Sequence, residues 1–98
     1  MKAVMITFDQ AHYERIVDVL DRLNCRGYTS WPQVTGRGSV DGEPHHGSHA
    51  WPSMNSAILT VVPDERVASL LARLRAFDAE SPRLGLRAFT WTLDSEGV

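Results

Sequence analysis

Apolar residues at alternate positions open the chain and then change to helical spacing. Lys2 to Phe8 alternates, which predicts a β-strand. Gln10 to Asn24 has apolar residues at the spacing of a helix, and Asp9 is a suitable N-cap for it. Asn24 through Gly27 is expected to close this helix, and Gly27 can take the left-handed conformation that helix ends favour. The apolar helix positions are Tyr13, Ile16, Val17, Leu20 and Leu23.

The next part of the chain divides into a strand and a long irregular stretch. Tyr28 to Thr35 predicts a second strand, in which Pro32 indicates an edge position or a bulge. Gly36 to Ser53 is rich in glycine and proline and has no periodicity. A loop of this length within a small domain is usually functional or mobile.

Regular patterns return in the last part of the chain. Asn55 to Val62 is a β-branched run that predicts a buried strand. Asp64 is expected to cap a second helix, which gives way to a polar turn from Asp78 to Gly85. Leu86 to Leu93 predicts the last strand. The apolar stripe of the second helix contains Val67, Leu70, Leu71, Leu74 and Phe77.

The order of these elements predicts an α+β fold of the ferredoxin-like βαββαβ type. In that arrangement two βαβ units share one antiparallel sheet and both helices lie on the same face. The strands carry apolar residues at both odd and even positions, so the second face of the sheet must also be buried. One domain with two helices cannot cover both faces, and we expect the free face to pack against other copies of the chain.

The length and net charge of the chain limit the classes of protein to which it can belong. The 98 residues are expected to form a single domain, 1–98, with a long loop at about 36–53. The net charge of −2 argues against nucleic-acid binding, and no apolar run is long enough for a membrane span. Cys25 is the only cysteine, so we expect a buried filler residue in a cytoplasmic protein.

Three histidines in the loop form the sharpest local feature. His45, His46 and His49 lie within five residues among glycines. Imidazole nitrogens bind Zn²⁺, Cu²⁺ or Ni²⁺ when the backbone lets the rings converge. The alternative is a solvated loop in which these side chains have no metal.

A second candidate site precedes the histidines. Gly36, Arg37 and Gly38 could form a turn whose backbone amides hold a phosphate. Two glycines around an arginine also occur in ordinary loops, so this spacing alone leaves both interpretations open.

Several short segments, in this order, resemble the PII signal-transduction family. The segment at 33–38 resembles the family's approach to its long T-loop, and the one at 61–64 resembles its Val-Val-Pro-Asp turn. The segments are Gly27-Tyr28-Thr29, Gln33-Val34-Thr35-Gly36-Arg37-Gly38, Trp51-Pro52, Val61-Val62-Pro63-Asp64 and Arg87-Ala88-Phe89.

This resemblance implies a homotrimer that binds an adenine nucleotide in clefts between subunits. Thr29 would then lie near the adenine, and Gly36 and Gly38 would let the backbone approach the phosphates. Arg37 and Arg87 would supply positive charge.

The sequence departs from the family pattern in the T-loop-like segment, at positions that are characteristic of the nitrogen-regulating members. Residues 36–52 contain no tyrosine, and Ser39 and Val40 stand in place of a basic residue and a glutamine. The resemblance therefore implies a divergent PII-like protein.

Three functions remain open at this stage. The first is a sensor in which an adenine nucleotide, or another small anion such as bicarbonate, orders the loop toward a partner such as a transporter or an enzyme. The second is a metal sensor or buffer using the loop histidines, and the third is a trimeric interaction module without a ligand. An enzyme is not expected, because no nucleophile and base are placed together.

Overall fold

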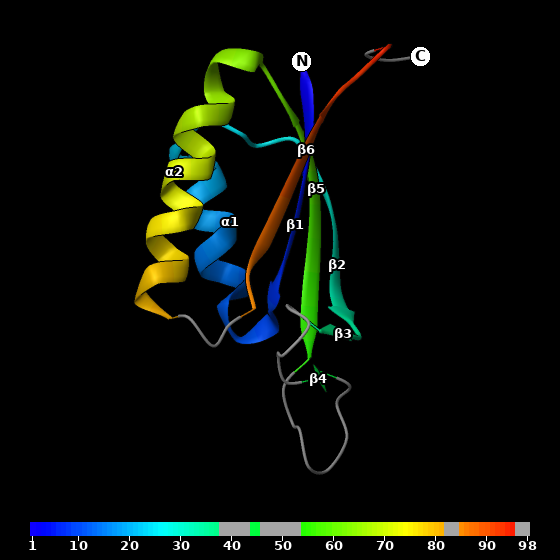
Figure 1. The fold of residues 1–98 in the computed structure, drawn as a ribbon, viewed down its shortest axis with the longest axis vertical. Coiled ribbons are helices and arrows are strands. Elements are labelled where there is room, and N and C mark those ends of the chain that lie inside the picture. Colours follow the sequence, from blue (N-terminus) through cyan, green and yellow to red (C-terminus); the bar gives the residue numbers. More distant parts are fainter. Residues whose placement is uncertain (38–43, 46–53, 82–84, 96–98) are drawn as a thin grey trace.

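A four-stranded sheet with two helices on one face forms the body of the protein (Figure 1). The computed structural model describes residues 1–37, 44–45, 54–81 and 85–95, with the backbone alone at 36, 37, 44 and 45. The elements in chain order are β1 (Lys2–Asp9), the 3₁₀ turn η1 (Gln10–His12), α1 (Tyr13–Arg22), β2 (Tyr28–Val34), β3 (Gly36–Arg37), β4 (Pro44–His45), β5 (Asn55–Val62), α2 (Asp64–Glu80) and β6 (Arg87–Thr92).

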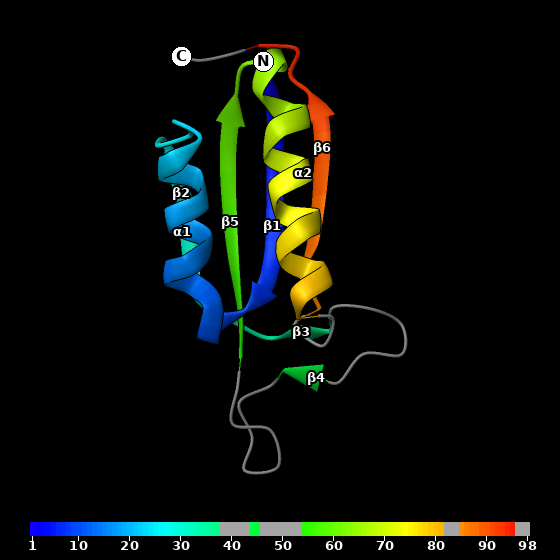
Figure 2. The same ribbon diagram turned by 90° about the vertical axis from the view of Figure 1, so that its left-hand side faces the viewer.

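The sheet has the strand order β2-β5-β1-β6, and each neighbouring pair is antiparallel. β1 and β5 are therefore central, while β2 and β6 are the two edges. Both helices lie in front of the sheet in Figure 2. This arrangement confirms the predicted ferredoxin-like βαββαβ fold.

The core lies between the helices and the sheet face formed by the even-numbered residues of β1 and β5. Each of these strands alternates, so the even positions meet the helices and the odd positions lie on the other face. The largest apolar side chains buried in this core are Val4, Ile6, Phe8, Ile16, Leu20, Ile58, Val62, Leu70 and Leu74.

β2 is an edge strand with a bulge, as Pro32 indicates. Its register to β5 shifts between Trp31 and Val34. Two buried hydroxyl groups of β5 hold β2 in place beside it. The Ser56 hydroxyl donates to the Pro32 carbonyl at 2.6 Å, and the Thr60 hydroxyl donates to the Gly27 carbonyl at 2.7 Å.

The helix predicted from Gln10 begins there as a 3₁₀ turn, α1 itself begins only at Tyr13, and it ends earlier than predicted. The Asp9 carboxylate accepts a hydrogen bond from the Ala11 amide at 2.8 Å and so caps η1. α1 ends at Arg22, and the left-handed residue after it is Asn24, with φ 59°. The prediction for Gly27 was wrong. Asparagine adopts this conformation more readily than most side chains, so the turn comes three residues earlier.

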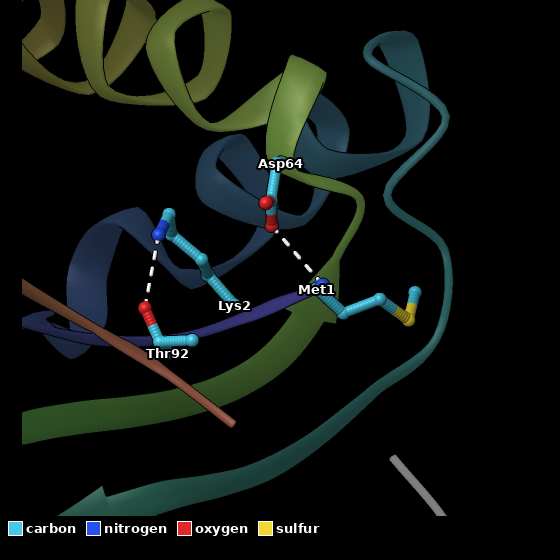
Figure 3. Close-up of polar contacts among 4 residues, drawn as sticks. All are labelled: Met1, Lys2, Asp64 and Thr92. Carbon is cyan, nitrogen blue, oxygen red and sulfur yellow. Dashed lines mark hydrogen bonds and ion pairs between the residues drawn. The ribbon is translucent and has the colours of Figure 1, made fainter. Parts of the chain in front are cut away.

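Both predicted ends of α2 were wrong. Pro63 occupies the N-cap position, and Asp64 is the first helical residue. Its carboxylate pairs with the α-amino group of Met1 at 3.0 Å, while the Lys2 ammonium donates to Thr92 at 3.0 Å (Figure 3). α2 continues through Asp78 to Glu80, where a turn was expected.

The long loop contains a small element of regular structure. β3 and β4 pair antiparallel, with Gly36 opposite His45 and Arg37 opposite Pro44. The expectation of a wholly irregular segment was therefore wrong for these four residues. Within the described part of the chain, no helix combines the length and apolar content needed to cross a bilayer.

Candidate functional site

The sheet face opposite the helices is apolar and open in the single chain. Four large side chains on it are 41–57% exposed, which is high for residues of this kind. Met5 and Leu59 lie between them on the central strands and are half-buried. The four exposed side chains are Trp31, Val61, Phe89 and Trp91.

The strand register arranges this open face in rows. One row runs from Thr29 through Leu59 and Met5 to Phe89. The next row runs from Trp31 through Ala57 and Thr7 to Arg87.

Thr29 and Arg87 consequently lie on opposite edges of the same sheet. They are three inter-strand spacings apart, roughly 14 Å or more. Both are exposed. A single chain does not bring these two predicted ligand residues into one site.

The base of the long loop lies at the same end of the sheet as the start of β6 (Figures 1 and 2). β3 follows β2 after one residue, and Figure 2 shows it running below the end of the sheet from β2 toward the β6 side. The Arg37 side chain and the whole of Gly38 lie outside the described residues. The phosphate-binding turn at 36–38 stays a prediction.

The predicted metal site falls almost entirely outside the described part of the chain. His46 and His49 are not described, and His45 is described by its backbone in β4. Among the residues whose side chains are described, no three histidine, cysteine, aspartate or glutamate residues gather as metal ligands. The metal prediction gains no support from the structure.

Two larger hollows lie beside α1. One, of about 400 Å³, includes Arg15 and Phe77, where the guanidinium carbon lies 5.0 Å from the ring centroid. The other, of about 450 Å³, lies beside the end of β2 and includes Gln10 and Gln33. The predicted ligand residues do not line either hollow.

Cys25 is buried, and its thiol is not poised for chemistry. It is 4% exposed, and burial raises the pKa of its thiol against the opposing effect of Arg66. A thiol with a raised pKa has less of the reactive thiolate at neutral pH. The prediction of a buried filler residue is confirmed.

Trp31, one of the tryptophans that could stack on a ligand or fill a contact between subunits, lies on this open face. It lies in the Arg87 row, on the edge strand that also carries Thr29. Alternation from Thr29 could have placed it on the open face, because residues two apart share a face.

The sequence matches one family model over most of its length. Residues 1–91 match the model for nitrogen regulatory protein P-II. A comparison with curated protein sequences found no match.

Solved structures of PII-like proteins resemble this chain. A structure of CPII, a nitrogen regulatory PII-like protein from Thiomonas intermedia K12 bound to ADP, AMP and bicarbonate, is 27% identical, with a TM-score of 0.75 over 92% of this chain and 82% of that chain. Another CPII structure from the same organism, bound to ADP and bicarbonate, is 29% identical, with a TM-score of 0.73 over the same shares. A putative PII-like signaling protein from Thermus thermophilus is 26% identical, with a TM-score of 0.66 over 92% of this chain and 83% of that chain.

Proposed function

Because the chain belongs to the nitrogen regulatory protein P-II family, we propose that it is a homotrimeric, non-enzymatic sensor of a small effector. The effector is an adenine nucleotide or another small anion, and it binds in the clefts between copies. The CPII structures bound to ADP, AMP and bicarbonate support this choice of ligands.

The position of Thr29 and Arg87 is the observation that carries this proposal. The two residues lie on opposite edges of one exposed apolar face. When copies close into a ring through such a face, the β2 edge of one copy meets the β6 edge of the next. Thr29 and Arg87 of neighbouring copies then line the same cleft.

Each predicted ligand residue has a role in this cleft. Thr29 lies beside the adenine, and the backbone of Gly36 and Gly38 approaches the phosphates. Arg37 and Arg87 neutralise the phosphate charge, as guanidinium groups do through paired hydrogen bonds.

The loop links the cleft to a partner protein. The whole chain, 1–98, acts as one domain, and the loop at 36–53 starts directly at the cleft. An effector at the base of this loop favours one loop conformation over others, which changes the surface offered to a cytoplasmic partner such as a transporter or an enzyme.

Calorimetric titration with ADP, AMP and ATP tests the ligand. The wild-type trimer is expected to release or absorb heat with at least one nucleotide. Arg87→Ala removes one charge-assisted hydrogen bond, worth about 1.5–3 kcal/mol, and should weaken binding roughly tenfold to a hundredfold.

Arg73→Ala is the matched control. It removes an exposed arginine from α2, away from the open face, and should leave nucleotide affinity unchanged. No heat with any of the three nucleotides would contradict an adenine nucleotide as the effector, and equal affinity in wild type and Arg87→Ala would contradict the role of Arg87 in the cleft.

A further inference from the structure

Trp31 is a large aromatic side chain at an edge of the open sheet face. It is 43% exposed and lies on β2 two residues after Thr29. The two side chains therefore project to the same face, roughly 6–7 Å apart along the strand. That spacing lets a single planar ligand touch both of them.

The row of the sheet that contains Trp31 offers a ligand more room than the next row does. An alanine lies directly opposite the tryptophan and a threonine follows, so no large side chain stands beside it on this row. The next row carries leucine, methionine and phenylalanine. Small neighbours leave the face of a large aromatic ring accessible to a ligand. In order, the row with the tryptophan consists of Trp31, Ala57, Thr7 and Arg87.

Assembly of copies through the open face brings Trp31 to the proposed cleft. Trp31 and Arg87 lie on one row but on opposite edges of the sheet. When the β2 edge of one copy meets the β6 edge of the next, Trp31 faces Arg87 of the neighbouring copy. One wall of the cleft is then a flat aromatic ring, and the other carries a positive charge. A nucleotide complements both walls, because it combines an aromatic base with negative phosphates.

We propose that Trp31 stacks on the base of the bound nucleotide and determines much of its affinity. The inference rests on the proposed nucleotide sensing and names the side chain that holds the base. Aromatic side chains stack on the flat faces of nucleobases, and tryptophan presents a large face for such a contact. Thr29 meets the edge of the base, and Arg87 of the neighbouring copy meets the phosphates.

Trp91 supplies a matched comparison, because Trp31 could instead act only as apolar cover between copies. Trp91 is on the same open face and is 46% exposed. It lies four residues after Arg87 on β6, roughly 13 Å along the strand, and so away from the proposed base. Both tryptophans would contribute alike to an interface between copies, whereas only Trp31 would contact a base.

Calorimetric titration of ADP and AMP into three variants tests the proposal. Trp31→Leu keeps an apolar side chain but removes the ring, and it should weaken ADP binding about fivefold to 150-fold. AMP binding should weaken by the same factor, because stacking involves the base and not the phosphates. Trp31→Phe restores a ring and should recover most of the affinity. Trp91→Leu should bind both nucleotides as tightly as wild type, and sedimentation velocity checks that all three variants assemble as wild type does.

Tryptophan fluorescence gives a second measurement that leaves Trp31 in place. In a chain with Trp51→Phe and Trp91→Phe, Trp31 is the only tryptophan. ADP should quench its emission, because the base stacks on the indole. Ribose 5-phosphate, which lacks the base, should not quench it.

The outcomes distinguish this inference from the proposed function. Three results would overturn the role of Trp31 and leave nucleotide sensing intact: equal ADP affinity in wild type and Trp31→Leu, equal loss in Trp31→Leu and Trp91→Leu, or unchanged Trp31 emission at saturating ADP. Absence of ADP and AMP binding by the wild-type protein would overturn both.

Discussion

Phe89 offers the sharpest test of assembly through the open sheet face. It is 57% exposed in the single chain, at the end of the row that contains Met5 and Leu59. If a phenylalanine side chain has about 200 Å² to bury, the 57% left exposed is about 115 Å². At about 25 cal/mol per Å², covering that area contributes about 3 kcal/mol per copy, or about 9 kcal/mol per trimer.

Phe89→Asp should therefore convert the proposed trimer to monomers. The variant loses this apolar contribution and would place an unpaired carboxylate in the interface, which is costly when buried. Sedimentation velocity at micromolar concentration should show three times the mass of one chain for wild type and one chain mass for the variant.

Ala72→Asp is the control for the added charge. Ala72 is exposed on α2, on the opposite side of the molecule from the open face, so this variant should remain a trimer. Circular dichroism should show folded protein in both variants. A wild-type monomer, or a Phe89→Asp trimer as stable as wild type, would refute assembly through this face.

Three further substitutions test the interior and the helix end. Leu70→Ala removes a fully buried side chain of α2 and should lower the free energy of unfolding by about 2–5 kcal/mol in urea, and a loss below about 1 kcal/mol would contradict its core position. Ser56→Ala leaves the Pro32 carbonyl without its donor and should cost about 1–3 kcal/mol in guanidinium unfolding, whereas no change would argue against this tie between β5 and β2. The hydrogen bond and charge of the Met1 α-amino group lower the pKa of the Asp64 carboxyl. The stability that this carboxylate adds is therefore present at neutral pH and is lost as the pH falls through the folded-state pKa. Asp64→Asn should therefore be less stable than wild type near neutrality and equal to it in acid, and thermal melts showing the same difference at both pH values would contradict the pairing.

Much of the fold could be predicted because the residues within each strand alternate between the two faces of the sheet. Val4, Ile6 and Phe8 share one face through backbone geometry alone, and the stripe of α2 identifies what covers them. Pro32 likewise marked β2 as an edge strand, because its missing amide hydrogen cannot join a ladder on both sides.

The helix ends could not be predicted in the same way, because they depend on distant groups. Asp64 suits an N-cap from local sequence, yet the chain start comes to it through the sheet and its carboxylate pairs there. The end of α1 was a choice between Asn24 and Gly27, and both residues tolerate the left-handed conformation that one of them adopts.

Predicting the candidate site required the register between strands, which cannot be derived from the sequence of any single strand. Thr29 and Arg87 could be named from the resemblance, but their separation across the sheet follows from pairing with β1 and β5. The convergence of His45, His46 and His49 depends on loop backbone angles that the glycines leave unrestricted. That metal site stays a prediction.

Mixed trimers test the account most directly, because their ADP binding shows whether Thr29 and Arg87 of one cleft come from different copies. Thr29→Glu and Arg87→Ala homotrimers should each fail to bind ADP tightly. After unfolding and refolding as an equal mixture, every mixed ring contains one cleft with both native residues, so about one cleft in four should regain wild-type affinity. Calorimetry of the refolded mixture should measure that fraction, and a mixture that regains no ADP binding would contradict a site shared between copies.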